Sequence, residues 1–253
     1  WIPQSSARNL GELGEWSFIP GQPSAASTAP LYTVLLAIGY KLGIGYQLWT
    51  HLLGALSLGV SAIVGIRLAQ RLLPGTRIIG IATGAALLLA WHLIWAAASG
   101  METMLFSMMT LIMIWLVWRE LDDDISQNDK DIARRGAVFG AITALSVATR
   151  PEAALLAAIA GAMLWLSHPR EKWRNMLIWS ITSAIVFMIM ITPYLLLNLH
   201  LTDDLLPNTS AAKMAEYRPL LQQSYPTRIT NLVIPIIAGG QLLLLPGAFY
   251  AVW

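Results

Sequence analysis

Long apolar stretches, separated by short polar segments, run through most of the chain. A helix that crosses a bilayer needs about 20 mostly apolar residues. Seven stretches reach or approach that length: 46–68, 78–98, 104–118, 137–149, 153–166, 176–199 and 229–252. The fourth and fifth are short, and we expect their helices to extend into the flanking polar residues. The pattern predicts an all-α fold, a polytopic transmembrane helical bundle of about seven spans.

An eighth apolar stretch, 31–45, differs from the others. It has about fifteen residues, contains Lys41 and follows a segment rich in Pro, Ser and Ala. This length is typical of an interfacial or re-entrant helix and not of a span. The sequence therefore predicts two regions. Residues 1–45 form a first outer loop with an interfacial helix, and 46–253 form the helical bundle, which includes an outer loop at 200–228.

Lys and Arg are concentrated in alternate loops between the predicted spans. The loops after the first, third and fifth spans hold most of the sixteen basic residues: Arg67, Arg71, Arg77, Arg119, Lys130, Arg134, Arg135, Arg170, Lys172 and Arg174. Under the positive-inside rule these loops are cytoplasmic. The short turns around Glu102 and Arg150, the loop 200–228 and residues 1–45 then lie on the opposite, outer face. The charged segment 119–135 is interpreted as a solvated connector.

Composition supports a membrane environment. Apolar residues make up 56% of the chain and charged residues only 12%, where a soluble domain is about one quarter charged. Cys is absent, which excludes thiolate metal sites and a Cys nucleophile. The net charge of +2 is spread over short loops, so no nucleic-acid partner is expected. The chain starts at Trp1 and ends in an apolar run, and we expect both ends to continue in a longer protein.

Two outer clusters have a spacing that allows two interpretations. Ser99 with Glu102, and Thr149 with Glu152, are spaced like capping boxes at helix N-termini. Arg150 is harder to explain structurally, because a cation on a very short connection between spans is costly unless it is paired. It can pair with Glu152 or Glu102, or bind a phosphate.

A third polar cluster occupies 202–213 and includes Asn208 and Lys213. A solvated loop with a turn at Pro207-Asn208 is the simpler interpretation. The four histidines are too dispersed for a zinc pattern. His51 and His92 fall within predicted spans and are interpreted as packing residues.

Several segments, taken in order, resemble one family. They are Trp1-Ile2, Ala7-Arg8-Asn9-Leu10, Gly14, Phe18, Pro20-Gly21 and Ser27-Thr28-Ala29-Pro30-Leu31-Tyr32, then Ser99-Gly100-Met101-Glu102-Thr103, Thr149-Arg150-Pro151-Glu152, and Leu206-Pro207-Asn208-Thr209 with Ala212-Lys213. This order is similar to that of bacterial and archaeal GT-C glycosyltransferases. These multi-span enzymes use polyprenyl-phosphate-linked sugars, and the group includes protein mannosyltransferases and the lipid A aminoarabinose transferase.

The resemblance implies an activity and a location. The chain is expected to belong to an integral protein of the plasma (inner) membrane of a bacterium or archaeon. It would transfer a sugar from a polyprenyl-phosphate donor to an acceptor hydroxyl, by single displacement, on the non-cytoplasmic face. The partners are this donor, an acceptor that is a protein, a lipid or a glycan, and the bilayer. The family's catalytic Asp is expected just before Trp1, so residues 1–253 alone are not expected to be active.

The resemblance also implies roles for individual residues. Glu102 occupies the position of a second acidic residue, which orients the acceptor or binds a metal. Arg150 and Lys213 would bind the phosphate, Glu152 would hold Arg150 in place, and Asn208 would hydrogen-bond to the sugar or phosphate. A divalent cation is the one cofactor that remains open, and no metal ligands are assigned.

Two other functions remain as alternatives, a transporter or flippase and a non-catalytic membrane subunit. A transporter typically places charged residues near mid-membrane and has broken helices in corresponding halves. Here the span interiors are nearly free of charge, and the charges lie at the outer ends. This distribution favours an enzyme at the membrane surface over a conduit.

Overall fold

The computed structural model describes residues 2–25, 27–122, 128–205, 215 and 217–238, and these are mostly helical. The chain divides into two compact units, Trp1–Asn208 and Thr209–Trp253. The first unit contains α1 (Ile2–Leu13), β1 (Ser17–Ile19), β2 (Gln22–Pro23), α2 (Pro30–Lys41), α3 (Tyr46–Leu72), α4 (Arg77–Leu89), α5 (Trp91–Ala98), α6 (Thr103–Asp122), α7 (Asp129–Thr149), α8 (Ala153–Ser167), η1 (Arg170–Lys172) and α9 (Trp173–Thr202). The second contains α11 (Tyr225–Ala238).

Three helical segments of the described chain are long and apolar enough to cross a membrane. They are Tyr46–Leu72, Thr103–Leu121 and Arg170–Thr202, and the pair α4 and α5 makes a fourth if the two count as one span. These helices are compatible with a membrane protein. The predicted number of about seven spans is not confirmed. Helix α8 has only 15 residues, α7 begins with the charged run Asp129–Arg135, and most of 229–252 lies outside the described residues.

The predicted span 78–98 is divided in the structure. Helices α4 and α5 meet at an angle of 52°, and Ala90 between them has an extended backbone (φ −65°, ψ 108°). The carbonyl oxygen of Ala90 then accepts hydrogen bonds from the N–H groups of Leu93 and Ile94, which starts α5. The apolar pattern continues through the break, and the sequence therefore gave no sign of it.

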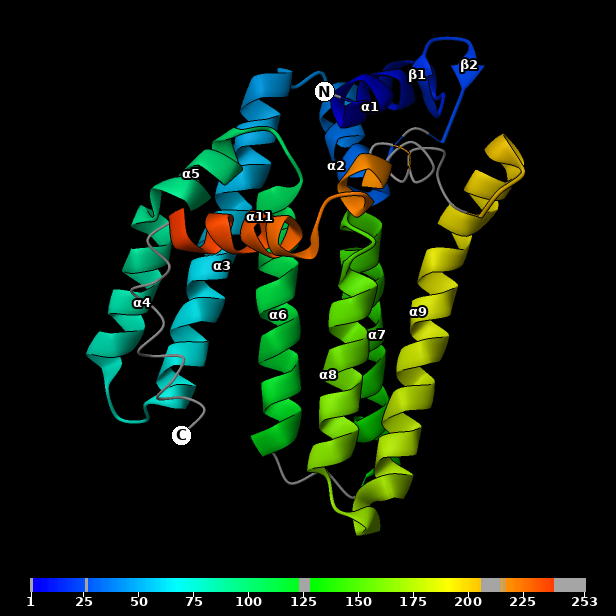
Figure 1. The fold of residues 1–253 in the computed structure, drawn as a ribbon. Helices are drawn as coiled ribbons and strands as arrows, with labels where there is room; N and C mark the ends of the chain where they lie inside the picture. Colours follow the sequence, from blue (N-terminus) through cyan, green and yellow to red (C-terminus); the bar gives the residue numbers. More distant parts are fainter. Residues whose placement is uncertain (1, 26, 123–127, 206–214, 216, 239–253) are drawn as a thin grey trace. The chain divides into compact units, whose positions relative to one another are not determined.

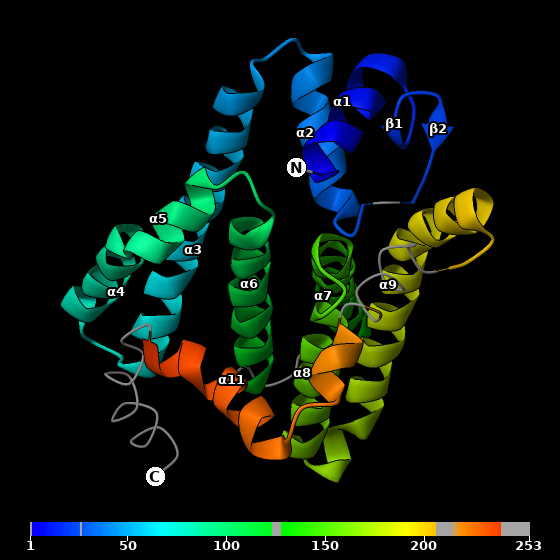
Figure 2. The same cartoon turned by 45° about the horizontal axis from the view of Figure 1, so that its top comes forward.

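Helices α3, α6, α7, α8 and α9 of the first unit run side by side, and α1, the hairpin and α2 gather at one end of them (Figures 1 and 2). Helix α2 has 12 residues, or about 18 Å at 1.5 Å per residue, which is too short to cross a bilayer. This agrees with the prediction that 31–45 is not a span. Its position at the membrane surface stays a prediction.

The N-terminal segment, from α1 to α2, is held together by a small core and by the side-chain amide of Asn9. Ala7 of α1 packs in a cluster with Tyr32 and Leu36 of α2. The buried Asn9 side chain donates Nδ2 hydrogen bonds to the carbonyl oxygens of Ser17 (3.0 Å) and Phe18 (3.2 Å). These bonds fix the β1–β2 hairpin against α1, because a buried amide must find partners.

Helices α7 and α9 pack closely through two glycines. A Cβ added at Gly136 or at Gly140 would come within 3.0 Å of a backbone carbonyl oxygen of α9, that of Trp179 or of Ser183 respectively. The two glycines are four residues apart and so lie on one face of α7. This GxxxG arrangement brings the two backbones together, as small residues do between membrane helices. The packing fixes the position of α7, whose last residue, Thr149, precedes Arg150.

Candidate functional site

Two of the three polar clusters predicted to lie outside, those of Glu102 and Arg150, lie at one end of the first unit, and most of the third, 202–213, lies outside the described residues. Helix α6 begins and α7 ends at this end, which α1 and α2 also adjoin (Figure 1). The guanidinium of Arg150 lies 5.8 Å from the centroid of the Phe106 ring. The N–H of Phe106 in turn donates a hydrogen bond of 2.9 Å to the carbonyl oxygen of Glu102. Glu102 therefore lies one helical turn before the residue that the Arg150 guanidinium approaches.

Arg150 follows the last residue of α7 in an extended conformation (φ −151°), with its backbone N–H bonded to the carbonyl oxygen of Ser146 at 2.8 Å. Its side chain forms an ion pair of 3.4 Å with Glu152, and the two side chains are 35% and 59% exposed. A pair this exposed contributes little to stability. Among the described residues no other group accepts a hydrogen bond from this guanidinium, so its remaining N–H groups can bind an anion.

The capping-box interpretation is wrong at the first turn. Ser99 ends α5, where its Oγ donates to the carbonyl oxygen of Ala96 at 2.8 Å and accepts from the N–H of Met101 at 3.2 Å. Helix α6 starts only at Thr103. Two residues at capping-box spacing thus belong to the end of one helix and the start of the next, which spacing alone cannot reveal.

The interpretation is also wrong at the second turn. Thr149 is the last residue of α7, and its Oγ1 donates to the carbonyl oxygen of Leu145 at 2.8 Å. Helix α8 begins at Ala153, and Glu152 before it makes no side-chain cap hydrogen bond. The predicted contact between Arg150 and Glu152 is present, while the roles in substrate binding stay predictions.

A cavity of about 390 Å³ lies beside Glu102, between α1, the start of α3 and the turn from α5 to α6. We call it the polar cavity. Its polar side chains include Gln4, Gln47, Thr50, His51, Ser99 and Glu102. Gln4 Nε2 donates a hydrogen bond of 2.8 Å to Thr50 Oγ1 and so connects α1 to α3. No Lys or Arg is among the described residues that line the cavity. Its chemistry suits uncharged hydroxyl-bearing groups beside one carboxylate.

Three of these residues were missed by the sequence interpretation. Gln47, Thr50 and His51 are spaced at i, i+3 and i+4 and share a face in the first turns of α3. The interpretation of His51 as a packing residue is wrong, because its side chain is exposed and lines the polar cavity. The sequence contained a signal for these residues, because they form a short polar face at one end of an otherwise apolar helix.

The pKa of Tyr32 in α2 depends on burial and on the charge of Glu102. Its side chain is buried in the core between α1 and α2. Burial, and secondly the negative charge of Glu102, raise the pKa of Tyr32 from 10.0 to about 12. Both effects disfavour the tyrosinate, so Tyr32 is a neutral neighbour of Glu102 at physiological pH.

Asn208 and Lys213 lie outside the described residues, and their predicted roles are not tested. Before them, α9 ends at Thr202 and is followed by Asp203, which has a left-handed backbone (φ 55°). The buried Asn198 donates Nδ2 to the carbonyl oxygen of Leu205 at 3.1 Å. In the part of the chain that the structure describes, no group of three or more His, Asp or Glu side chains could hold a metal ion.

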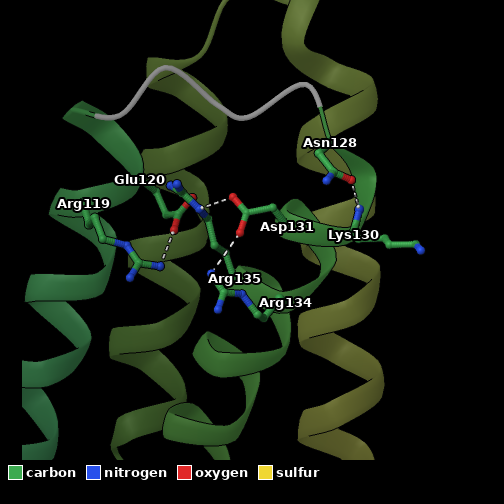
Figure 3. Close-up of polar contacts among 7 residues, drawn as sticks. All are labelled: Arg119, Glu120, Asn128, Lys130, Asp131, Arg134 and Arg135. Carbon is green, nitrogen blue, oxygen red and sulfur yellow. Dashed lines mark hydrogen bonds and ion pairs between the residues drawn. The ribbon is translucent and has the colours of Figure 1, made fainter.

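The opposite end carries a charge cluster that was not predicted (Figure 3). Glu120 of α6 is 7% exposed, and it lies 3.4 Å from Arg119 and 3.7 Å from Arg135 of α7. Arg135 also pairs with Asp131 at 3.2 Å. The interpretation of 119–135 as a solvated connector is therefore wrong at both its ends, which are helical and joined by a buried carboxylate.

No family model, no curated protein and no solved structure matches this chain. The resemblance to GT-C glycosyltransferases consequently rests on the order of the motifs in the sequence. The geometry adds that two of these motifs, those containing Glu102 and Arg150, lie at the same end of the helices.

Proposed function

We propose that this chain is the membrane region of a GT-C-type glycosyltransferase that moves a sugar from a polyprenyl-phosphate donor to an acceptor hydroxyl on the non-cytoplasmic face. The observation that carries the proposal is the placement of Arg150 and Glu102. The Arg150 guanidinium lies beside the ring of Phe106, which is one helical turn from Glu102, and Glu102 is in the wall of the polar cavity. A carboxylate in a cavity of neutral polar groups suits a hydroxyl acceptor, and a cation near the same end of α6 suits the donor phosphate.

The acceptor and the donor phosphate bind to different groups of this site. The polar cavity has hydroxyl, amide and imidazole side chains but no cation among its described lining residues, and it receives the acceptor. Arg150, which lies next to Phe106 and has free N–H donors, faces the donor phosphate. Holding both reactants in one geometry lowers the barrier, because a bimolecular step becomes effectively unimolecular.

The reaction forms one bond and breaks one. The acceptor oxygen bonds to the anomeric carbon of the sugar, and the bond from that carbon to the phosphate oxygen breaks. The electron pair leaves with the polyprenyl phosphate, whose added charge Arg150 stabilises. The acceptor proton goes to a general base, a role that the resemblance gives to an Asp. Glu102 accepts a hydrogen bond from the acceptor hydroxyl and orients it.

Transfer can be measured in proteoliposomes that contain the full-length protein and isotope-labelled polyprenyl-phosphate sugars. We expect Arg150→Gln and Glu102→Gln each to lower the rate by about 10- to 100-fold, because a lost charge-assisted hydrogen bond costs about 1.5–3 kcal/mol. Arg170→Gln is the matched control, since Arg170 is an exposed cation next to Trp173 and outside this site. Wild-type turnover in both site variants, with an unchanged fold, would remove these residues from the site.

One observation favours the transporter alternative. The bend of 52° between α4 and α5 resembles the broken helices that form transporter sites at mid-membrane. The residues at this break are Leu89, Ala90 and Trp91, which offer no charged group to a substrate. The same proteoliposomes discriminate the functions. Sugar on an acceptor supports transfer, and unchanged donor in the opposite leaflet supports transport. The absence of both results supports a non-catalytic subunit.

A further inference from the structure

A small cavity lies between α6, α7, α8 and α9, at the end of these helices opposite the candidate site. We call it the Trp179 cavity. Its volume is about 10 Å³, measured as the space open to the centre of a water molecule, and one water molecule needs about this much. Its polar lining groups belong to Glu120 of α6, Arg135 of α7, and Asn175 and Trp179 of α9. The cavity therefore has the size and the polarity of a site for one water molecule.

The indole of Trp179 provides a buried donor that has no acceptor in the described part of the protein. The side chain is 5% exposed, and its Nε1 is sealed from solvent without a hydrogen-bond partner. An indole N–H can only donate, and leaving such a group unpaired in the interior costs free energy. The ring packs against that of Phe139, with 4.8 Å between the centroids. A small acceptor that comes from solvent can satisfy this N–H.

The covered position of Nε1 indicates that the N–H is directed into the Trp179 cavity. Trp179 also lines a second hollow, an open groove of about 360 Å³ between α8 and α9. An N–H directed into that groove would be exposed, whereas Nε1 is covered. The cavity also holds the stronger hydrogen-bonding groups, because a carboxylate and an amide line it.

The carboxylate of Glu120 provides an acceptor in the same cavity (Figure 3). Glu120 is 7% exposed, and its two oxygens are near different cations. Oε1 lies 3.4 Å from Arg119, and Oε2 lies 3.7 Å from Arg135. Because a carboxylate has about four lone-pair sites, Glu120 can accept a further hydrogen bond.

These two groups select water as the occupant. An anion would be repelled by the carboxylate of Glu120, and a metal cation cannot accept a hydrogen bond from the indole of Trp179. Water accepts from an N–H and donates to a carboxylate at the same time. The amide of Asn175 offers a third partner, and a buried water typically makes about three hydrogen bonds.

We propose that one water molecule occupies the Trp179 cavity, where it accepts a hydrogen bond from Trp179 Nε1 and donates one to the carboxylate of Glu120. This inference does not depend on the proposed function. Helices α7 and α9 already touch, since a Cβ at Gly136 would come within 3.0 Å of the carbonyl oxygen of Trp179. The water adds α6 to this contact, because Glu120 belongs to α6.

Solid-state NMR of the full-length protein in liposomes tests the proposal directly. With isotope-labelled tryptophan, magnetisation transferred from water to an indole N–H identifies an indole that binds water. We expect this transfer at Trp179, whose signal is identified by its loss in Trp179→Phe. Trp49 is the matched control, because its Nε1 donates directly to the carbonyl oxygen of Leu35 at 2.8 Å and should receive no such transfer.

A second measurement determines whether this water also binds Glu120. The benzothiophene analogue of tryptophan keeps the shape of the ring but has sulfur in place of the N–H. At position 179 it should raise the unfolding constant in mixed micelles about fivefold, since a hydrogen bond contributes about 1 kcal/mol net.

Combination of the analogue at position 179 with Glu120→Gln should have an effect at least about twofold smaller than the product of the separate effects, because both changes act on one water. The same analogue at position 49, combined with Glu120→Gln, should give the full product, because Trp49 does not line this cavity.

Three outcomes decide the proposal. Water transfer to Trp179 together with coupling to Glu120 supports it. The absence of transfer would show that no water binds the indole and would overturn it. Transfer without coupling would show that the N–H meets water away from Glu120, which overturns it as well. Each outcome holds whether or not sugar transfer occurs.

Discussion

The packing of α7 on α9 allows a quantitative prediction for one added methyl group. Gly140→Ala places a Cβ within 3.0 Å of the carbonyl oxygen of Ser183, and also near the Ser183 carbonyl carbon and Cα. These are backbone atoms of a helix, which cannot rotate away as a side chain can. The two helices must therefore move apart along their closest line of contact.

The expected cost follows from two opposing contributions. Overpacking of a tightly packed contact costs about 1–3 kcal/mol. Replacement of Gly by Ala inside a helix regains up to about 1 kcal/mol of helix propensity. We therefore expect Gly140→Ala to lower the free energy of unfolding by about 1–2 kcal/mol.

Gly161→Ala in α8 is the matched control. A Cβ at Gly161 meets no atom within 4 Å, so only the propensity gain remains, and this variant should be as stable as the parent chain or up to about 1 kcal/mol more stable. Unfolding in mixed micelles, followed by loss of helical circular dichroism, measures both variants. Equal stability of the two would refute the close backbone contact between α7 and α9.

Two further predictions concern buried ionisable groups. Glu120→Gln should destabilise the chain by about 1.5–3 kcal/mol, because it removes one of the two carboxylates that pair with Arg135 and weakens charge-assisted hydrogen bonds in a buried cluster. The exposed Glu171→Gln should have no effect, and equal unfolding curves for the two variants would contradict the buried pair. The folded-state pKa of Tyr32, about 12, exceeds its ordinary value of 10.0, so its contribution to stability is complete below about pH 10 and is lost as the pH rises from 10 to 12. Tyrosinate absorbance, compared with that of a Tyr32→Phe variant, should show this late titration, and Glu102→Gln should lower the pKa of Tyr32; a Tyr32 that titrates near pH 10 would contradict its burial.

The sequence predicted contacts between the outer motifs better than it predicted their local structure. Arg150 and Glu152 pair as expected, and Glu102 lies at the same end of α6. The capping boxes failed because a four-residue spacing does not say which of two helices each residue belongs to. His51 was misjudged because an apolar surrounding sequence was taken as evidence of burial, although its side chain lines the polar cavity.

The sequence alone determined the helical class, the approximate position of helices such as α3, α6 and α9, and the separation of charges between the two ends. These properties depend on local hydrophobicity and on the cost of unpaired backbone groups in lipid. Each long apolar stretch is subject to both effects independently of the rest of the chain. The sequence also predicted that α2 is not a span, because the length of an apolar stretch can be read from the sequence directly.

The tertiary structure decided which groups meet. The polar cavity combines Gln4, Thr50 and Glu102 from three separate elements. Arg150 contacts α6 through the ring of Phe106, and Glu120 is buried where Arg135 approaches it from α7. Such contacts depend on how helices pack against one another. The residues around one member of such a contact do not indicate which distant residue is its partner. The burial and the ion pairs arise only when the helices pack together.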